Sequence, residues 1–218
     1  MSSYTQMATN ICYKKTGEKL KQQYHHGNLR EALVQEAIRL LEAEGLAGLS
    51  LRRVAREVGV SQAAPYSHFK DKQALFLAVC VTGYDRFSER MRTEAGTLTG
   101  PAYIAGLGRG YIYFALENPA LFQLMFDGEL QDLPDGLLAD SQFGEGYRML
   151  DRGLAQFPIP YFQDDALSRA ISWGVVHGLA QLLLSGRMKP ENHGFDDMNE
   201  FVRSTMDKFV GGVELSHQ

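Results

Sequence analysis

The chain has 218 residues, of which 44% are hydrophobic and 22% are charged, a composition typical of a globular protein with a packed core. Its net charge of −4 argues weakly against a nucleic-acid partner, and its longest apolar runs stay well short of the roughly 20 residues of a membrane span. Two cysteines, Cys12 and Cys80, are too few for a disulfide framework and lack the spacing of a metal site. No secretory signal pattern opens the chain, so we expect a cytoplasmic protein without a membrane partner.

The overall charge hides an asymmetry. Residues 1–72 carry 11 Lys/Arg and 7 Asp/Glu, whereas residues 73–218 carry 11 and 19, so the first third has a net charge of +4 and the remainder −8. A basic N-terminal third on an acidic body is typical of a DNA reader with a separate regulatory domain.

The first predicted helix follows a polar segment. Residues 1–24 contain four lysines and no apolar periodicity, and we expect them to form a mobile tail. Asn28 and Glu31 form a capping pattern ahead of apolar residues with helical spacing, and Gly45 ends the helix. This helix supplies the apolar face on which the next two short helices pack, because short helices cannot bury enough surface alone.

Residues 51–72 have the pattern of two helices joined by a tight turn. Ser50 is a natural N-cap, and Gly59 suits the left-handed conformation that ends a helix. The first helix carries one apolar stripe, and Ser61 can cap a second helix that runs to His68. Pro65 removes an amide donor near the start of that second helix, which we therefore expect to be short or distorted. The pair is a predicted helix-turn-helix, whose second helix can enter a DNA major groove.

The remaining chain also has helical patterns. Asp71 caps a long helix that runs toward Gly96, and Pro101 and Pro119 stand at favoured first positions of two further helices. Helices around residues 143–154, from 164 or 165 to 186, and 195–210 complete the pattern. We therefore expect an all-α fold of about nine helices, divided into a tail (1–24), a helix-turn-helix domain (25–72), a linking helix (73–96) and a C-terminal domain for ligand binding and dimerisation (97–218).

Residues 28–92 resemble the N-terminal domain of the TetR family of transcriptional regulators. The resemblance is carried by Ala37, Leu41 and Gly45, followed by Leu49–Leu51, Val54–Ala55, Gly59–Ser61, Tyr66–Phe69, Lys72 and Leu75. A shorter segment, Ile171–Leu179, is similar to the Trp-His-Gly element of one C-terminal domain class in this family. The resemblance implies a DNA-binding regulator rather than an enzyme, without a cofactor.

The residue types of the second short helix suit contact with DNA. Gln62 presents a donor and an acceptor to a base edge and Ala63 can touch a thymine methyl, so we expect these two, with Ser61, to contact bases. Tyr66, His68 and Lys72 resemble the family's phosphate-contacting positions, and Arg52 or Arg53 can reach the backbone as well. Phe69 and Val60 are expected in the core.

The body is rich in bulky side chains that fit either a core or a ligand pocket. The candidate pocket residues are Tyr111, Phe114, Phe122, Met125, Phe126, Met149, Trp173 and His177, with the last two as polar anchors. The helix that carries Trp173 also has small residues at Gly174, Gly178 and Ala180, which permit close helix approach. It is therefore an alternative candidate for a dimer seam.

Three other patterns do not meet the requirements of a phosphate, metal or catalytic site. Gly106–Gly110 could be mistaken for a phosphate-binding loop, but no strand precedes it, and close helix packing is the better interpretation. The acidic stretch from Asp127 has Asp132 and Leu138 where a calcium loop needs glycine and glutamate. The histidines lack ligand spacing, so we expect no metal, and no local motif of a nucleophilic triad is present.

These patterns predict a homodimeric repressor that leaves a pseudo-palindromic DNA operator when a small-molecule effector binds. Three alternatives stay open at this point: a transcriptional activator, an effector-independent DNA-organising protein, and a small-molecule enzyme with a convergent polar site in the body. The effector, the operator and the regulated genes are not encoded in any pattern of the chain.

Overall fold

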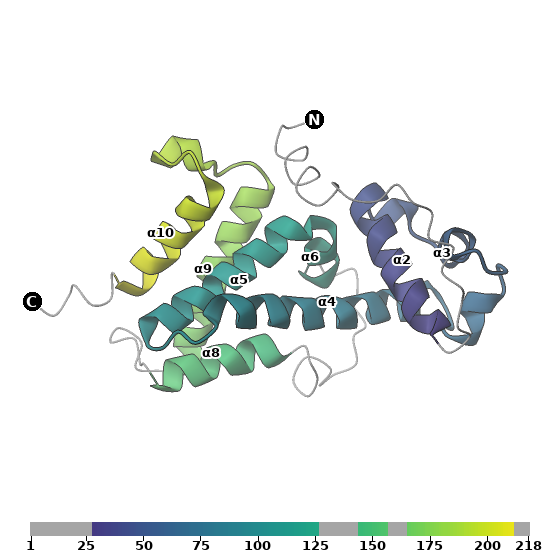
Figure 1. Ribbon diagram of the computed structural model, residues 1–218, viewed down its shortest axis with the longest axis horizontal. Coiled ribbons are helices and arrows are strands. Elements are labelled where there is room, and N and C mark those ends of the chain that lie inside the picture. The colour runs from purple at the N-terminus through teal and green to yellow at the C-terminus, as the bar shows by residue number, and fades with distance from the viewer. Residues whose placement is uncertain (1–27, 127–143, 157–164, 212–218) are drawn as a thin grey trace, which may run out of the picture.

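A computed structural model describes residues 28–126, 144–156 and 165–211, whose regular structure is entirely helical (Figure 1). The described ranges contain eight α-helices, three short 3-10 turns and no strand. The predicted all-α class is confirmed, and the number of helices is close to the expected nine. None of the helices in these ranges is both long and apolar enough to cross a bilayer.

The N-terminal unit packs two α-helices and a 3-10 turn around one apolar face. Helix α2 spans Leu29–Glu44, α3 spans Leu51–Val58, and the turn η2 spans Ala64–Ser67. The side-chain hydroxyl of Ser50 accepts the backbone N–H of Arg53 at 3.2 Å, which confirms the predicted N-cap of α3. Gly59 follows α3 with φ of 82°, the left-handed conformation expected there.

Two local predictions for this unit need correction. Asn28 occupies the N-cap position of α2, but its amide donates to the Glu31 carboxylate and caps no backbone N–H. The second short helix is not an α-helix: it is the 3-10 turn η2, with Pro65 in its first turn. The missing amide hydrogen of proline explains the shortening that Pro65 predicted.

Helix α4, Lys72–Ala95, runs from the N-terminal unit along the length of the body (Figure 1). Its N-terminus is capped as predicted, because the Asp71 carboxylate accepts the backbone N–H of Ala74 at 2.8 Å. Helix α5, Pro101–Glu117, packs closely along α4. A side chain at Gly110 would lie only 2.4 Å from Cα of Met91, so glycine is required for this close approach. The Gly106–Gly110 segment is thus a helix-packing element, as predicted.

The other body helices surround α5. They are α6 (Pro119–Phe126), α8 (Glu145–Gln156), α9 (Asp165–Leu184) and α10 (Met198–Gly211). Helices α9 and α10 pack on α5, and α8 packs on α4, α5 and α9. Helix α10 starts three residues later than expected, because the Asp197 carboxylate caps it through the backbone N–H of Glu200. The predicted tail and the acidic stretch from Asp127 lie outside the described residues.

Candidate functional site

The turn η2 presents a polar surface at the far end of the N-terminal unit. Pro65 is buried and Phe69 is 2% exposed, so these two residues fix the turn against the core. The exposed residues between and beside them include every predicted base or phosphate contact of this segment, namely Ser61, Gln62, Ala63, Tyr66 and His68. Tyr66 is 51% exposed although its ring is large and aromatic, which leaves its hydroxyl accessible to a partner.

Backbone hydrogen bonds hold this turn rigidly. The N–H of Ala64 donates to the carbonyl of Ser61 at 3.0 Å, and the N–H of Phe69 donates to the carbonyl of Pro65 at 2.9 Å. The hydroxyl of Ser67 also donates to the carbonyl of Ala64 at 2.8 Å. The predicted base-contacting residues therefore lie on an ordered scaffold rather than on a loose loop.

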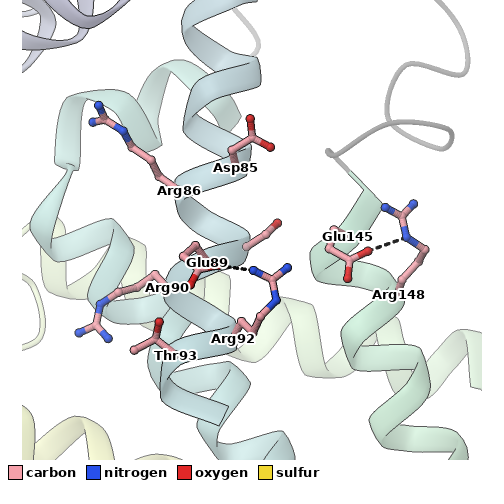
Figure 2. A pocket seen from close by; sticks show the side chains of 9 residues that line it. Asp85, Arg86, Glu89, Arg90, Arg92, Thr93, Glu145 and Arg148 are labelled. Carbon is pink, nitrogen blue, oxygen red and sulfur yellow. Dashed lines mark hydrogen bonds and ion pairs between the residues drawn. The ribbon is translucent and has the colours of Figure 1, made fainter. Parts of the chain in front are cut away.

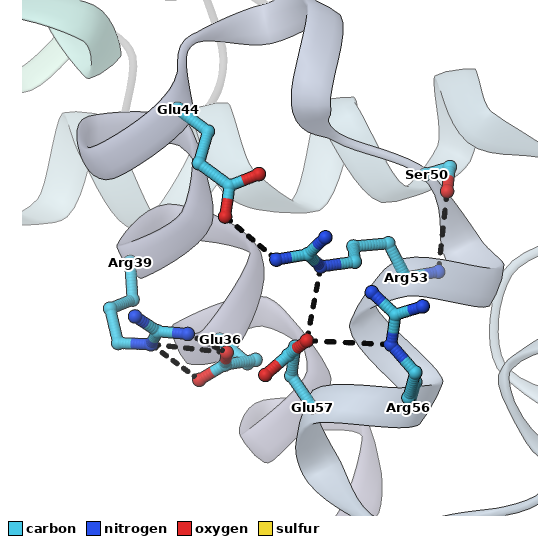
Figure 3. A network of polar contacts seen from close by, with 7 residues as sticks. All are labelled: Glu36, Arg39, Glu44, Ser50, Arg53, Arg56 and Glu57. Carbon is cyan, nitrogen blue, oxygen red and sulfur yellow. Dashed lines mark hydrogen bonds and ion pairs between the residues drawn. The ribbon is translucent and has the colours of Figure 1, made fainter.

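The flanking cations differ in their availability. Arg52 is exposed on α3 and has no ionic partner within the described part of the chain. Arg53 instead bridges two carboxylates, with Nη2 2.8 Å from Glu44 and Nε 3.0 Å from Glu57 (Figure 3). Lys72 Nζ lies 4.8 Å from the centre of the Phe76 ring. The phosphate contact predicted for Arg53 stays a prediction, and it competes with an internal role for this residue.

The N-terminus of α6 is held by a carboxylate from the N-terminal unit. Glu42 on α2 accepts the backbone N–H of Leu121 at 2.8 Å and that of Ala120 at 3.2 Å. These N–H groups lack helical partners because they lie in the first turn of α6. Burial raises the pKa of Glu42 above its ordinary value, although the two backbone hydrogen bonds oppose this shift. No local pattern predicted this contact.

Helix α4 also holds α6 closely. The Tyr84 hydroxyl donates to the carbonyl of Met125 at 3.3 Å. A side chain at Gly83 would lie 2.7 Å from Sδ of Met125 and 3.1 Å from Leu121. Burial raises the pKa of the nearby Cys80 thiol to about 12, so Cys80 is an inert core group rather than a reactive thiol. Helix α6 is therefore fixed on one side to α2 and on another to α4.

An apolar cavity of about 280 Å³ lies inside the body. Six helices contribute to its wall, since α4, α5, α6, α8, α9 and α10 each supply at least two lining residues. Its lining side chains are aromatic or aliphatic, with a few hydroxyl groups: Tyr84, Phe87, Met91, Ile104, Leu107, Gly108, Tyr111, Met125, Phe126, Gly146, Tyr147, Leu150, Ser172, Trp173, Val176, Met206 and Phe209. The volume lies near the lower limit of ordinary ligand sites.

A hydrogen-bonded triad lies at the wall of this cavity. The indole Nε1 of Trp173 donates to the Tyr111 hydroxyl at 3.1 Å, and that hydroxyl lies 2.8 Å from Nδ1 of His177. Because an indole N–H can only donate, the Tyr111 oxygen accepts it and keeps its own hydrogen available for His177. Burial raises the pKa of Tyr111, and it raises that of Tyr147 to about 12, so both phenols stay neutral at ordinary pH.

Four of the eight predicted pocket residues lie in the cavity wall: Tyr111, Met125, Phe126 and Trp173. His177 lies behind it, bonded to Tyr111. The other three are buried core residues that do not line the cavity: Phe114, Phe122 and Met149. Lining residues on α4 and α10 were not among the predicted pocket residues, although the aromatic side chains of Tyr84, Phe87 and Phe209 are a usable signal.

The outer side of α9 is apolar and exposed. Leu167, Ile171 and Leu182 are exposed at 59%, 39% and 38%, and they share one helical stripe with Gly174 and Gly178. A side chain at either glycine would meet open space. The third small residue of the predicted seam, Ala180, is fully buried and faces the interior instead.

A second hollow, between α4 and α8, is lined mainly by charged residues (Figure 2). Its arginines are engaged by the chain itself: Arg92 with Glu89, Arg148 with Glu145, Arg86 with Gln35, and Arg90 with Glu94 and Glu117. Three of these arginines pair with carboxylates and Arg86 bonds to a neutral amide, so the hollow holds mostly paired cations rather than a prepared anion site. In the described ranges, no group of three or more His, Cys, Asp and Glu side chains could hold a metal ion.

The exposed turn at residues 61–68, called the reading turn below, occurs in this chain together with an apolar cavity. Comparison with known proteins explains this combination. Residues 33–79 match the family profile described as "Bacterial regulatory proteins, tetR family", and residues 104–209 match "Tetracyclin repressor-like, C-terminal domain". A solved protein of unknown function from Rhodococcus sp. RHA1 is 34% identical, with a TM-score of 0.65, and the match covers 88% of this chain and 98% of that one. The chain belongs to the TetR family.

Other relatives match over shorter stretches or at lower identity. The chain is 48% identical over 50 residues to the class C tetracycline repressor protein of Escherichia coli, which is 23% of each chain. It is 25% identical over 97 residues to the regulator YobS of Bacillus subtilis, covering 44% of this chain and 51% of YobS. The chain thus spans about half the length, or less, of these curated relatives. The TetR-family regulator PfmR of Thermus thermophilus shares the fold with a TM-score of 0.58 at 17% identity, over 83% of this chain and 95% of that one.

Proposed function

We propose that this TetR-family protein is a homodimeric transcriptional repressor that binds a pseudo-palindromic DNA operator and leaves it when a small molecule fills the apolar cavity. One observation carries the proposal: the cavity wall and the reading turn are joined through α4 and through the contact between Glu42 and α6. Such a regulator acts in the cytoplasm, where DNA is accessible to it.

The proposed contacts with DNA lie on the exposed surface around η2. Gln62 and Ala63 lie at the surface with their neighbour Ser61, and they are the side chains that we assign to base edges. Tyr66, His68 and Lys72 flank them and are assigned to phosphates, together with exposed Arg52. Because η2 is short, one copy buries too little surface for tight specific binding.

Two observations support a dimer: one copy of the reading turn buries too little surface on DNA, and α9 has an exposed apolar face. Two copies joined through Ile171, Gly174, Gly178 and Leu182 bury an apolar stripe that a single chain leaves in water. A two-fold dimer presents two reading turns to half-sites about one helical turn, or a multiple, apart. This seam uses the outer face of α9, whereas the cavity uses its inner face, so both roles predicted for the helix are compatible.

The release mechanism follows from the position of α6. Met125 and Phe126 line the cavity on α6, and Glu42 holds the other end of the same helix. A ligand that displaces either side chain moves α6 against α2 and α4, which changes the position of the reading turn. The coupling free energy of such systems is typically about 1–3 kcal/mol, or about a 5- to 150-fold change in affinity.

We also assign Trp173, His177 and Gly178 to the Trp-His-Gly element that the sequence resembles. The spacing of four residues puts Trp173 and His177 on one side of α9, and both contact the Tyr111 hydroxyl. Gly178 lies on the exposed face of α9. The element thus joins the cavity wall to the proposed seam.

Selection of bound sequences from a random DNA pool tests this function. Wild-type protein should enrich a two-fold symmetric site, and Gln62→Ala should relax the preference at one position in each half-site. Tyr66→Phe and Lys72→Ala should weaken binding about equally on all sequences, because phosphate contacts carry no base information. An unchanged preference profile for Gln62→Ala would show that Gln62 does not read a base.

The same selection separates the alternatives. A DNA-organising protein binds equally well after the half-sites are scrambled, and it needs no effector. An activator binds the symmetric site but raises transcription from an adjacent promoter, whereas a repressor lowers it. An enzyme would convert small molecules even when Gln62 and Tyr66 are both replaced by alanine.

A further inference from the structure

The described residues that line the apolar cavity include no charged group. Of the described residues that line it, none is Asp, Glu, Lys or Arg, and the polar atoms are hydroxyl groups and one indole N–H. A charged ligand entering this cavity loses its hydration without gaining a counter-ion, at a cost of several kcal/mol. The composition of the wall therefore favours an uncharged ligand over a carboxylate or an ammonium ion.

The volume of the cavity limits the size of the ligand. An apolar cavity of about 150 Å³ accepts benzene. The present volume of about 280 Å³ is nearly twice as large and suits about two fused rings. Phe87 meets Tyr111 edge to face at 84°, and Trp173 meets Tyr147 in the same way at 81°, so ring faces and edges surround the space. Such a wall packs well against a flat aromatic ligand.

One fully buried polar side-chain atom of the wall lacks a partner within the described structure. Ser172 is 4% exposed, lines the cavity, and its Oγ makes no hydrogen bond within the described structure. Of the other polar groups, the Tyr84 hydroxyl donates to Met125 and the Trp173 indole donates to Tyr111, whereas Tyr147 is only part-buried. A buried hydroxyl without a partner is unfavourable, and a ligand group that bonds to it removes this cost.

We propose that the cavity binds an uncharged aromatic molecule of about two rings, which carries one hydroxyl or carbonyl group that hydrogen-bonds to Ser172 Oγ. This inference rests on the proposed function, because it names the chemical class of the effector for the same cavity. The hydroxyl of Ser172 both donates and accepts, so it suits either ligand group. The rings lie among Phe87, Tyr111, Phe126 and Trp173.

Calorimetric titration of the full chain without DNA tests this assignment. The probes are 2-naphthol, 2-naphthoate and 2-naphthylmethylammonium, which share two rings and differ in charge. We expect 2-naphthol to bind one site per chain with a Kd tighter than about 1 mM. Both charged probes should bind at least about tenfold more weakly, because none of the described lining residues offers a counter-ion.

Two serine variants locate the polar contact. Ser172→Ala should weaken 2-naphthol binding about three- to tenfold by removing its hydrogen-bond partner. Ser168→Ala is the matched control, since Ser168 is a buried serine one turn earlier on α9 that does not line the cavity. It should leave the affinity for 2-naphthol unchanged.

Three results would overturn the assignment: no heat from 2-naphthol, equal or tighter binding of either charged probe, or an unchanged affinity in Ser172→Ala. Because these titrations contain no DNA, they stand apart from the regulatory role. If 2-naphthol binds as expected but no cavity ligand releases the operator, the proposed function fails while the ligand class holds.

Discussion

The contact between Glu42 and α6 makes the sharpest prediction about stability. In Glu42→Ala, the backbone N–H groups of Ala120 and Leu121 lose their carboxylate, which now accepts them at 3.2 and 2.8 Å. Loss of an N-cap acceptor costs about 0.5–2 kcal/mol, and here two part-buried donors lose their partner, so we expect a loss of about 1–2 kcal/mol. Glu42→Gln keeps one acceptor oxygen, and its loss should be about half as large.

Urea denaturation at one fixed protein concentration measures these losses, because the proposed dimerisation would make stability depend on concentration. Glu36→Ala on the same helix is the matched control: it removes only a surface ion pair with Arg39, which is worth about 0–1 kcal/mol. If Glu42→Ala were as stable as the wild type, the Glu42 carboxylate would not stabilise the N-terminus of α6.

The pH dependence of the same contact has a definite sign. Burial raises the folded-state pKa of Glu42, so the folded chain binds a proton more readily than the unfolded chain. The contribution of Glu42 to stability is therefore fully present below its unfolded pKa, and it declines as the pH rises through the folded pKa. The stability of the wild type relative to Glu42→Gln should fall over that window. A difference that rises with pH would contradict the desolvation of this carboxyl.

Three further changes test separate parts of the structure. Gly110→Ala places a methyl group 2.4 Å from Cα of Met91, so it should destabilise the fold by about 1–3 kcal/mol in thermal or urea unfolding; a stability equal to wild type would contradict the close packing of α4 on α5. Ile171→Glu adds a charge to the proposed seam and should shift the protein to monomers in analytical ultracentrifugation, whereas a persistent dimer would place the seam elsewhere. Arg52→Ala should reduce the salt dependence of DNA binding by about one unit of slope, whereas Arg53→Ala should mainly lower stability, because Arg53 bridges two glutamates. Equal salt slopes for the two variants would refute that division of roles.

Most features that depend on neighbouring residues could be predicted from the sequence, although the expected Asn28 cap is absent because its amide bonds to Glu31. The caps at Ser50 and Asp71 and the left-handed Gly59 are local, because each involves residues within four positions. The all-α class followed from helical periodicity for the same reason. The distortion at Pro65 was also predictable, since one missing amide hydrogen suffices to explain it.

Features that join distant segments could not be predicted. Glu42 has the pattern of a surface residue of α2. Its carboxylate nevertheless accepts the backbone N–H of Ala120 in α6, 78 residues later in the chain. Arg53 has the pattern of a free cation, and only the fold reveals that it bridges Glu44 and Glu57. Trp173 was identified, but its partner Tyr111 lies 62 residues earlier, so the polar network at the cavity wall needed the structure.

The residues that line the cavity could not be predicted from the pattern of any single helix either. Periodicity marks Phe114 and Phe122 as apolar, but it does not distinguish core packing from a cavity wall. Ser172 is an inconspicuous residue of α9, and only its burial and its missing partner single it out. The orientation of each helix about its own axis decides these roles.

The central claim is that the cavity and the reading turn are energetically coupled. Operator affinity measured with and without a saturating cavity ligand tests it most directly. In Ser172→Ala, the release curve should shift to about three- to tenfold higher ligand concentration. We predict that the ligand weakens operator binding by about 5- to 150-fold. An operator affinity that stays unchanged while calorimetry shows the cavity occupied would contradict the coupling.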